Sequence, residues 1–162
     1  MTEKIEDTRD NYMEIIYNET PQEHASKFSQ TLLDLEDTIK IYGAIPVFTT
    51  IPTMSLANYN TRLYNKGRSS YFLHSNHYDD MQHLLNSTIE IINQQIFTIN
   101  ELNGLATPNL AGTVISKRGD GQGLRFRYAR LSDGLHPSHS LTANWKRLLL
   151  RIASQNRLTH ES

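Results

Sequence analysis

The residues best suited to catalysis lie in segment 133–137, Asp-Gly-Leu-His-Pro. Asp133 and His136 are three positions apart, so the carboxylate could bind one imidazole nitrogen and leave the other free to act as a base. The same spacing recurs at Asp80 and His83, but there it falls in a predicted helix and indicates a solvated surface pair. Segment 133–137 instead occupies a predicted loop directly before an amphipathic helix, which favours it as the chemical site.

A second candidate is the basic, aromatic segment 117–130. Its arginines could bind phosphate or RNA, with Phe126 and Tyr128 as stacking platforms. Alternating Arg-Phe-Arg-Tyr is also typical of a short, half-buried strand. The chain carries 16 Lys and Arg against 17 Asp and Glu, a formal net charge of -1. This balance argues against a nucleic-acid partner and favours the strand interpretation.

Composition excludes several other classes of site. The 162 residues include no cysteine, so disulfides and thiolate metal centres are ruled out. We predict neither a cofactor nor a metal, because the His/Asp cluster of His74, His77, Asp79 and Asp80 lacks a fixed helical or strand frame and its spacing is not that of a metal site. The polar start and the lack of a long apolar run predict no signal peptide and no membrane span, hence a cytoplasmic protein. The length predicts one domain over 1–162.

Helices and short strands are the elements that must position these residues. Thr20, Pro21 and Glu23 form a capping-box pattern that predicts a helix start, and Gly43 is a natural stop. Further helices are predicted over 4–18, 76–95 and 139–154. Their apolar residues recur at helical spacing, in stripes that comprise Phe28, Leu32, Leu35 and Ile39; Met81, Leu85 and Ile92; and Leu141, Trp145, Leu148, Leu149 and Ile152.

Two short apolar runs, 44–50 and 96–100, are typical of buried parallel strands. A long polar loop is predicted over 52–76. Because helices and strands alternate, we predict an α/β fold in three layers, α/β/α, with a flavodoxin-like parallel sheet. Two strands make a marginal sheet. We therefore expect a missing N-terminal segment, or a partner chain, to complete it.

Around the candidate site the chain resembles a known family. The string 132–138, Ser-Asp-Gly-Leu-His-Pro-Ser, followed by a terminal helix, looks like the last conserved block of the SGNH (GDSL-type) esterases. The turn at the end of 43–52 is similar to the end of that family's fourth strand. The likeness covers residues 22–154, and only the final block is specific. It implies that the chain is the C-terminal half of such a domain.

The resemblance implies a serine esterase that acts on a small carboxylic ester. His136 would be the general base, and Asp133 would orient it in a catalytic dyad. The family's Gly-Asp-Ser nucleophile block has no match here, so the nucleophile is not identified. Ser55, just after the predicted fourth strand, is the least improbable local candidate.

Three functions stay open at the level of sequence, and whether the chain is an enzyme is not decided. The first is the esterase, with its serine supplied from outside the chain. The second is a non-catalytic interaction module of related fold, in which Asp133 and His136 form a structural hydrogen bond. The third is an RNA- or phosphate-binding module that uses residues 117–130.

Overall fold

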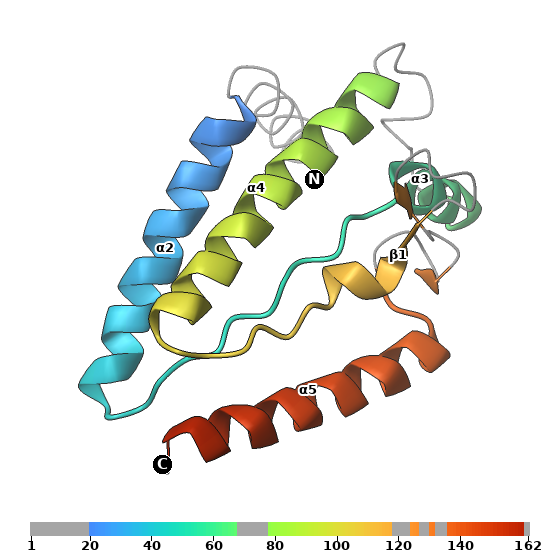
Figure 1. Ribbon diagram of the computed structural model, residues 1–162. Helices are drawn as coiled ribbons and strands as arrows, with labels where there is room; N and C mark the ends of the chain where they lie inside the picture. Colours follow the sequence, from blue (N-terminus) through green and yellow to red (C-terminus); the bar gives the residue numbers. More distant parts are fainter. Residues whose placement is uncertain (1–19, 68–77, 118–123, 127–129, 132–135, 161–162) are drawn as a thin grey trace.

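The computed structural model describes residues 20–67, 78–117, 124–126, 130–131 and 136–160. In chain order, the described elements are α2 (Pro21–Ile41), α3 (Leu56–Asn65), α4 (Tyr78–Leu102), the 3-10 helix η1 (Ala111–Val114), β1 (Ile115–Lys117), β2 (Leu124–Phe126) and α5 (His139–His160). Helices α2 and α4 lie side by side, and α5 lies apart from them (Figure 1). Two extended segments, 44–55 and 105–110, run between α4 and α5.

Helix α2 starts where the capping box predicts. The Glu23 amide donates to Thr20 Oγ1 at 3.2 Å, and the Thr20 amide donates to Glu23 Oε2 at 2.7 Å. The Thr20 amide, and next the Thr20 hydroxyl, donate to the Glu23 carboxylate and hold the pKa of Glu23 below its ordinary value, because they favour the charged form. The predicted apolar stripe is only partly buried: Leu32 is buried, whereas Phe28 and Leu35 are 36% and 46% exposed.

A core between α2 and α4 holds the two helices together. Its buried members are Ala25, Leu32, Ile92, Ile96 and Ile99, and Phe48 of the first extended segment packs against them. A second core forms where α5 begins, from Val114, Leu131 and Leu141, with Trp145 packed beside it. Trp145 Nε1 also donates to Thr113 Oγ1 at 2.7 Å, which ties α5 to η1.

The predicted strand at 96–100 is wrong, because these residues are the C-terminal part of α4. The run of apolar residues suits either state, and helical spacing prevails: Ile92, Ile96 and Ile99 all reach the core against α2. Helix α4 continues to Leu102, and Gly104, with a φ of 67°, follows two residues later. A positive φ is easily adopted by glycine, which makes it a common end to a helix.

The predicted strand at 44–50 runs as an extended segment without a strand ladder. One backbone hydrogen bond, from Thr50 N to the Pro108 carbonyl at 3.2 Å, joins it to segment 105–110. Three prolines, Pro46, Pro52 and Pro108, interrupt the two segments, and proline has no N–H to donate to a ladder. This composition explains why two adjacent extended chains do not form a regular sheet.

The predicted α/β fold with a flavodoxin-like parallel sheet is therefore wrong. The strands in the described part of the chain are three residues long and pair antiparallel, with Ser116 opposite Arg125. The assignment to the SGNH esterases, and with it the description as an α/β hydrolase, is wrong for the same reason: that family is built on a parallel sheet, and this chain is mainly helical.

Two smaller expectations also change. The predicted loop 52–76 contains a ten-residue helix, α3. The terminal helix is confirmed but is longer than predicted, ending at His160. The predicted helix 4–18 lies outside the described residues. Among the helices that the structure describes, none combines the length and the apolar character that crossing a bilayer requires.

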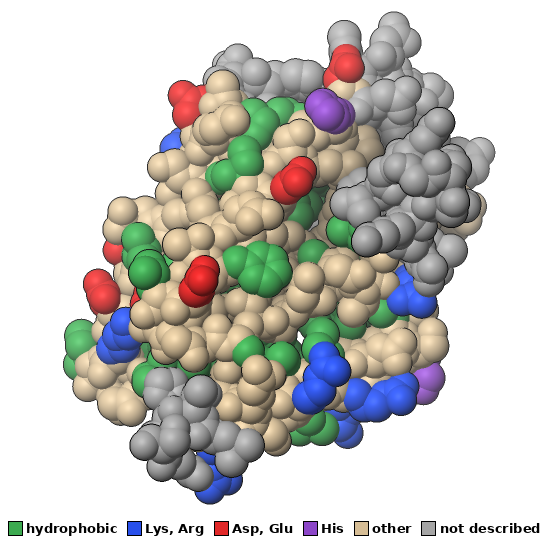
Figure 2. Space-filling model, in the orientation of Figure 1, with side chains coloured by type: hydrophobic (Ala, Val, Ile, Leu, Met, Phe, Trp, Pro, Cys, Tyr) green, Lys and Arg blue, Asp and Glu red, His purple; other side chains and the backbone are tan. Residues whose placement is uncertain are grey.

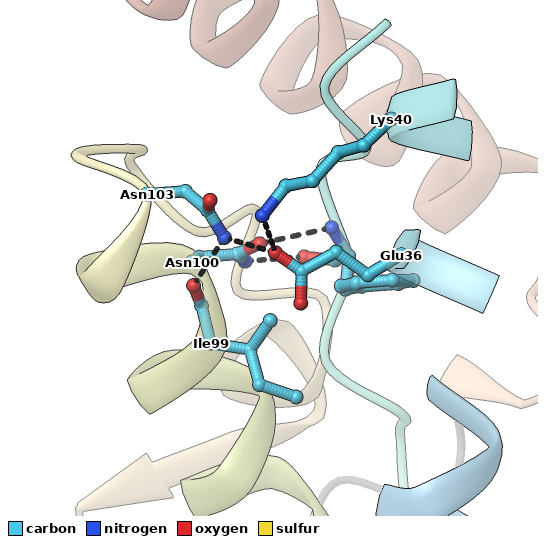
Figure 3. Close-up of polar contacts among 6 residues, drawn as sticks. Glu36, Lys40, Ile99, Asn100 and Asn103 are labelled. Atoms are coloured by element: carbon cyan, nitrogen blue, oxygen red, sulfur yellow. Dashed lines mark hydrogen bonds and ion pairs between the residues drawn. The ribbon is translucent and has the colours of Figure 1, made fainter. Parts of the chain in front are cut away.

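A buried carboxylate closes the end of the α2–α4 pair (Figure 3). Glu36 is only 6% exposed, and its Oε1 accepts from Lys40 Nζ and from Asn103 Nδ2, each at 2.6 Å. Asn103 Nδ2 also donates to the Ile99 carbonyl at 2.9 Å. The hydrogen bond from Lys40 is the main cause that holds the pKa of Glu36 below its ordinary value, against the opposing effect of burial.

We predict that Glu36 makes the stability of the fold depend on pH. Its pKa is lower in the folded chain, so its contribution is present above the ordinary glutamate pKa of about 4.3. That contribution is lost as the pH falls through the lower, folded pKa. In urea unfolding, Glu36→Gln should therefore destabilise the chain at pH 7 and do so much less at pH 3. Glu90→Gln, at an exposed position of α4, is the control. An equal loss for Glu36→Gln at both pH values would contradict the assignment.

Candidate functional site

A row of amide side chains on one face of α4 holds the first extended segment. The row consists of Gln82, Asn86, Asn93 and Asn100. Asn100 binds both backbone groups of Phe48: its Oδ1 accepts from Phe48 N at 3.1 Å, and its Nδ2 donates to Phe48 O at 2.7 Å. Asn93 binds Ile51 in the same way, at 2.7 and 2.8 Å. Each asparagine thus takes the place that a neighbouring strand residue has in a sheet.

The row continues towards the start of α4. Asn86 bonds to the hydroxyl of Thr53. Gln82 Nε2 donates to the Met54 carbonyl, and Gln82 Oε1 accepts from Leu56 N, both at 2.9 Å. The segment therefore stays bound to α4 up to the first residue of α3.

The spacing of the row matches the spacing of the segment. Asn86, Asn93 and Asn100 are seven residues apart, which is about 10.5 Å along a helix. Phe48 and Ile51 are three residues apart, which is about 10 Å along an extended chain. Because the two distances agree, Asn93 and Asn100 each meet a backbone site of the segment, and Asn86 meets the Thr53 hydroxyl. The segment and α4 run in opposite directions.

A third asparagine clamps the second extended segment from the other side. Asn156 of α5 accepts from Ala106 N at 2.8 Å and donates to Ala106 O at 3.2 Å. Asn156 is only 5% exposed and Asn100 is fully buried. Buried amides without partners are costly, so these clamps fix the positions of α4, α5 and both segments together.

These bonds leave one edge of segment 44–50 open. Phe48 and Thr50 direct their backbone groups inward, to Asn100 and to Pro108. In an extended chain the groups of alternate residues point to opposite edges. Within the described part of the chain the N–H and C=O of Ile45, Val47 and Thr49, the residues that alternate with Phe48 and Thr50, make no hydrogen bond, and the next residue of that series, Ile51, is bound by Asn93. We call these three residues the open edge.

The open edge is accessible and partly apolar. Ile45 is 46% exposed and Val47 is 37% exposed. Phe48, the next residue, points to the opposite face and packs on the core of α2 and α4. Pro46 has no N–H, but it alternates with the three residues of the open edge and belongs to the same series as Phe48 and Thr50. It therefore removes no hydrogen-bond donor from the open edge.

Of the residues predicted for catalysis, the structure describes His136 and Ser55 but not Asp133, so the Asp133–His136 dyad is not tested. His136 is exposed, and its Nδ1 lies 3.4 Å from Nη1 of Arg62 on α3. Asp133 lies outside the described residues. Ser55 is 4% exposed, and its Oγ accepts from the Asn58 amide at 3.3 Å, so it caps α3. A buried capping hydroxyl is poorly placed for attack on an ester.

The other predicted residues have structural roles where they are described. Arg130, at the end of the basic segment, donates from Nη1 to the Thr113 carbonyl at 2.7 Å. Leu124–Phe126 forms β2, as the strand interpretation of this segment expects. Asp80 and His83 are both exposed on α4. No group of three or more His, Asp or Glu side chains in the described ranges could hold a metal ion.

The amide row itself was missed in the sequence, although a signal exists. Asparagine recurs at 86, 93 and 100, on the same side of the helix as Ile92 and Ile96. A buried polar residue at heptad spacing indicates that the helix binds polar groups of another segment. The signal was obscured because 96–100 was assigned to a strand, which breaks the helical register after Asn93.

Comparison with protein-family models, with curated proteins and with solved structures finds no match for this chain. The function therefore has to be argued from the geometry alone.

We predict that Asn100 is the most important residue of the row. Asn100→Ala removes both bonds to Phe48 and one to Thr107 Oγ1, and it leaves buried groups without partners. The free energy of unfolding should fall by about 2–4 kcal/mol in urea titration. Gln94→Ala, at an exposed position of the same helix, should change it by less than about 0.5 kcal/mol. Similar losses for the two variants would show that the row does not hold the fold.

Proposed function

We propose that this chain is a protein-interaction module that binds an extended strand of a partner polypeptide at the open edge of Ile45, Val47 and Thr49. The observation that supports the proposal is the alternation of backbone groups in segment 44–50, with one edge occupied by amide side chains and the other without partners among the described residues. Strand addition uses such an edge: the main chain supplies affinity, and alternate side chains supply specificity.

The rigidity of the segment supports this role. A strand that must be ordered on binding loses affinity to the entropy of ordering. Here Asn93 and Asn100 fix the segment at Ile51 and Phe48 before any partner arrives. The bound strand then has to order only itself.

The exposed side chains of the open edge indicate which residue types a binding strand would carry. Ile45 and Val47 are exposed, branched and apolar, and they lie on the same face of the segment. A complementary strand would carry β-branched or aromatic residues at every second position, because such cross-strand pairs are stabilising. It would have no proline where its N–H must reach Val47 or Thr49.

The esterase remains without support from the described geometry. Ser55, the serine that the sequence favoured as nucleophile, is buried and caps α3. His136 lies beside Arg62. The RNA interpretation of 117–130 is not tested, since 118–123 and 127–129 lie outside the described residues; Arg130 bonds to the backbone of η1. The non-catalytic interpretation is the one that the arrangement of Asn93, Asn100 and the open edge favours.

Selection from a displayed library of ten-residue peptides tests the proposal. We expect the selected peptides to alternate β-branched residues and to lose at least about tenfold in affinity for Val47→Pro, which removes one outward N–H. Val47→Thr is the matched control: it keeps both the N–H and the branched shape, and binding should change little. Peptides that bind Val47→Pro and the unmodified chain equally well would show that the open edge is not the binding site.

A further inference from the structure

The charges of this chain are separated between its helices. Helix α5 carries four basic residues and no Asp or Glu, whereas α4 carries four acidic residues and no Lys or Arg. In Figure 2 the acidic side chains lie over α2 and α4, and most of the basic side chains in view lie along α5, with others over α2. The net charge of -1 therefore hides a strongly basic surface.

The basic residues lie on the face of α5 that points away from the fold. Leu141, Ile152 and Asn156 are buried on the inner face. Outside are Lys146, Arg147, Arg151 and Arg157, all exposed. Arg147 bonds to Asn144 of its own helix, at 2.8 Å. Lys146 and Arg151 form no hydrogen bond or ion pair with the described residues, so their charges are available to a ligand.

These four side chains form two rows. Around the axis of α5, where each residue turns by about 100°, Ala143 marks the middle of the outer face. Lys146 and Arg157 lie about 40–60° to one side of it, and Arg147 and Arg151 lie about 40–80° to the other. Between the rows lie uncharged residues, among them Leu150 and Ser154. Lys146 and Arg157 are eleven residues apart, about 16 Å along the axis.

We propose that the outer face of α5 binds the phosphate backbone of a nucleic-acid duplex. A helix of ordinary diameter fits the major groove of a DNA duplex, where a phosphate strand runs along each side. The row with Lys146 would meet one strand and the row with Arg151 the other. The uncharged strip of Ala143, Leu150 and Ser154 would face the groove.

An anionic membrane is the competing partner, and the composition of α5 argues against it. A helix that binds a bilayer inserts a broad apolar face between the headgroups. The apolar stripe of α5 is directed into the fold, and its outer face offers Leu150, 60% exposed, flanked by basic residues. A surface with one apolar side chain and four cations matches phosphates better than lipid tails.

Salt dependence of binding tests the proposal on the full chain. The probes are a fluorescein-labelled 16-base-pair DNA duplex and an RNA duplex of the same sequence. Binding is followed by fluorescence anisotropy between 50 and 200 mM salt. Four phosphate contacts predict a slope of about -3.6 in log K against log salt, an affinity loss of roughly 100-fold. A preference for one duplex identifies which nucleic acid supplies the phosphates.

A matched pair of double variants locates the site. Lys146→Gln with Arg151→Gln should reduce the slope by about 2 and weaken binding at least tenfold at 100 mM salt. Lys27→Gln with Lys66→Gln changes the net charge equally at exposed sites on and beside other helices and should leave the slope unchanged. Equal unfolding midpoints in urea confirm that the variants are folded, and the single variants replace any double variant that is not.

Three results would overturn the proposal. The first is no binding of either duplex at 50 mM salt. The second is an equal loss for the two double variants, which would mean diffuse attraction without a site. The third is binding to vesicles of phosphatidylcholine and phosphatidylserine, at about 7 to 3, without binding to the duplexes.

Discussion

The fold depends on asparagine side chains that take the place of a β-sheet. Asn93 and Asn100 of α4 bind the backbone of segment 44–55, and Asn156 of α5 binds the backbone of segment 105–110. In a sheet each extended chain would satisfy its neighbour. Here two helices satisfy one edge of each chain through their own amides, which is effective because an amide side chain offers the same donor and acceptor as a peptide group.

Helix positions, core packing and the open edge all follow from these bonds. A segment bound in this way is fixed on one side and unsatisfied on the other, so the interaction that builds the fold also creates the surface for a partner.

Local signals in the sequence predicted α2 and α5, but not α3 or the last two turns of α4. The capping box at Thr20 places the start of α2, because its bonds are formed within one turn and need no tertiary contact. The apolar spacing from Leu141 to Ile152 likewise predicts α5. The strand assignment at 96–100 was wrong because a short apolar run suits both states, and the decision depends on what lies opposite. Segment 44–50 is extended, as its composition suggests, but its neighbours are side chains of a helix and not strands. No local pattern in Ala-Ile-Pro-Val contains that information.

The candidate sites show the same limit. Asp133 and His136 were selected for their chemistry, and Ser55 for its place in the sequence, but the structure uses the Ser55 hydroxyl as a helix cap. The overall charge argued against a nucleic-acid partner, yet charge acts through its distribution: α4 and α5 carry opposite signs on separate faces. Residues that act through spacing on a folded surface, such as Asn86 with Asn100 or Lys146 with Arg151, become evident only when the helices are placed.

Amide hydrogen exchange, followed residue by residue on the full chain, tests the central claim most directly. The account predicts strong protection of the Phe48 and Ile51 amides, which donate to Asn100 and Asn93, and of Ala106, which donates to Asn156. The amides of Ile45, Val47 and Thr49 should exchange far faster, since they face the open edge. Equal protection along 45–51 would mean that a strand ladder covers both edges, and rapid exchange of Phe48 and Ile51 would mean that the amide clamps do not hold the segment. Either result would contradict the account.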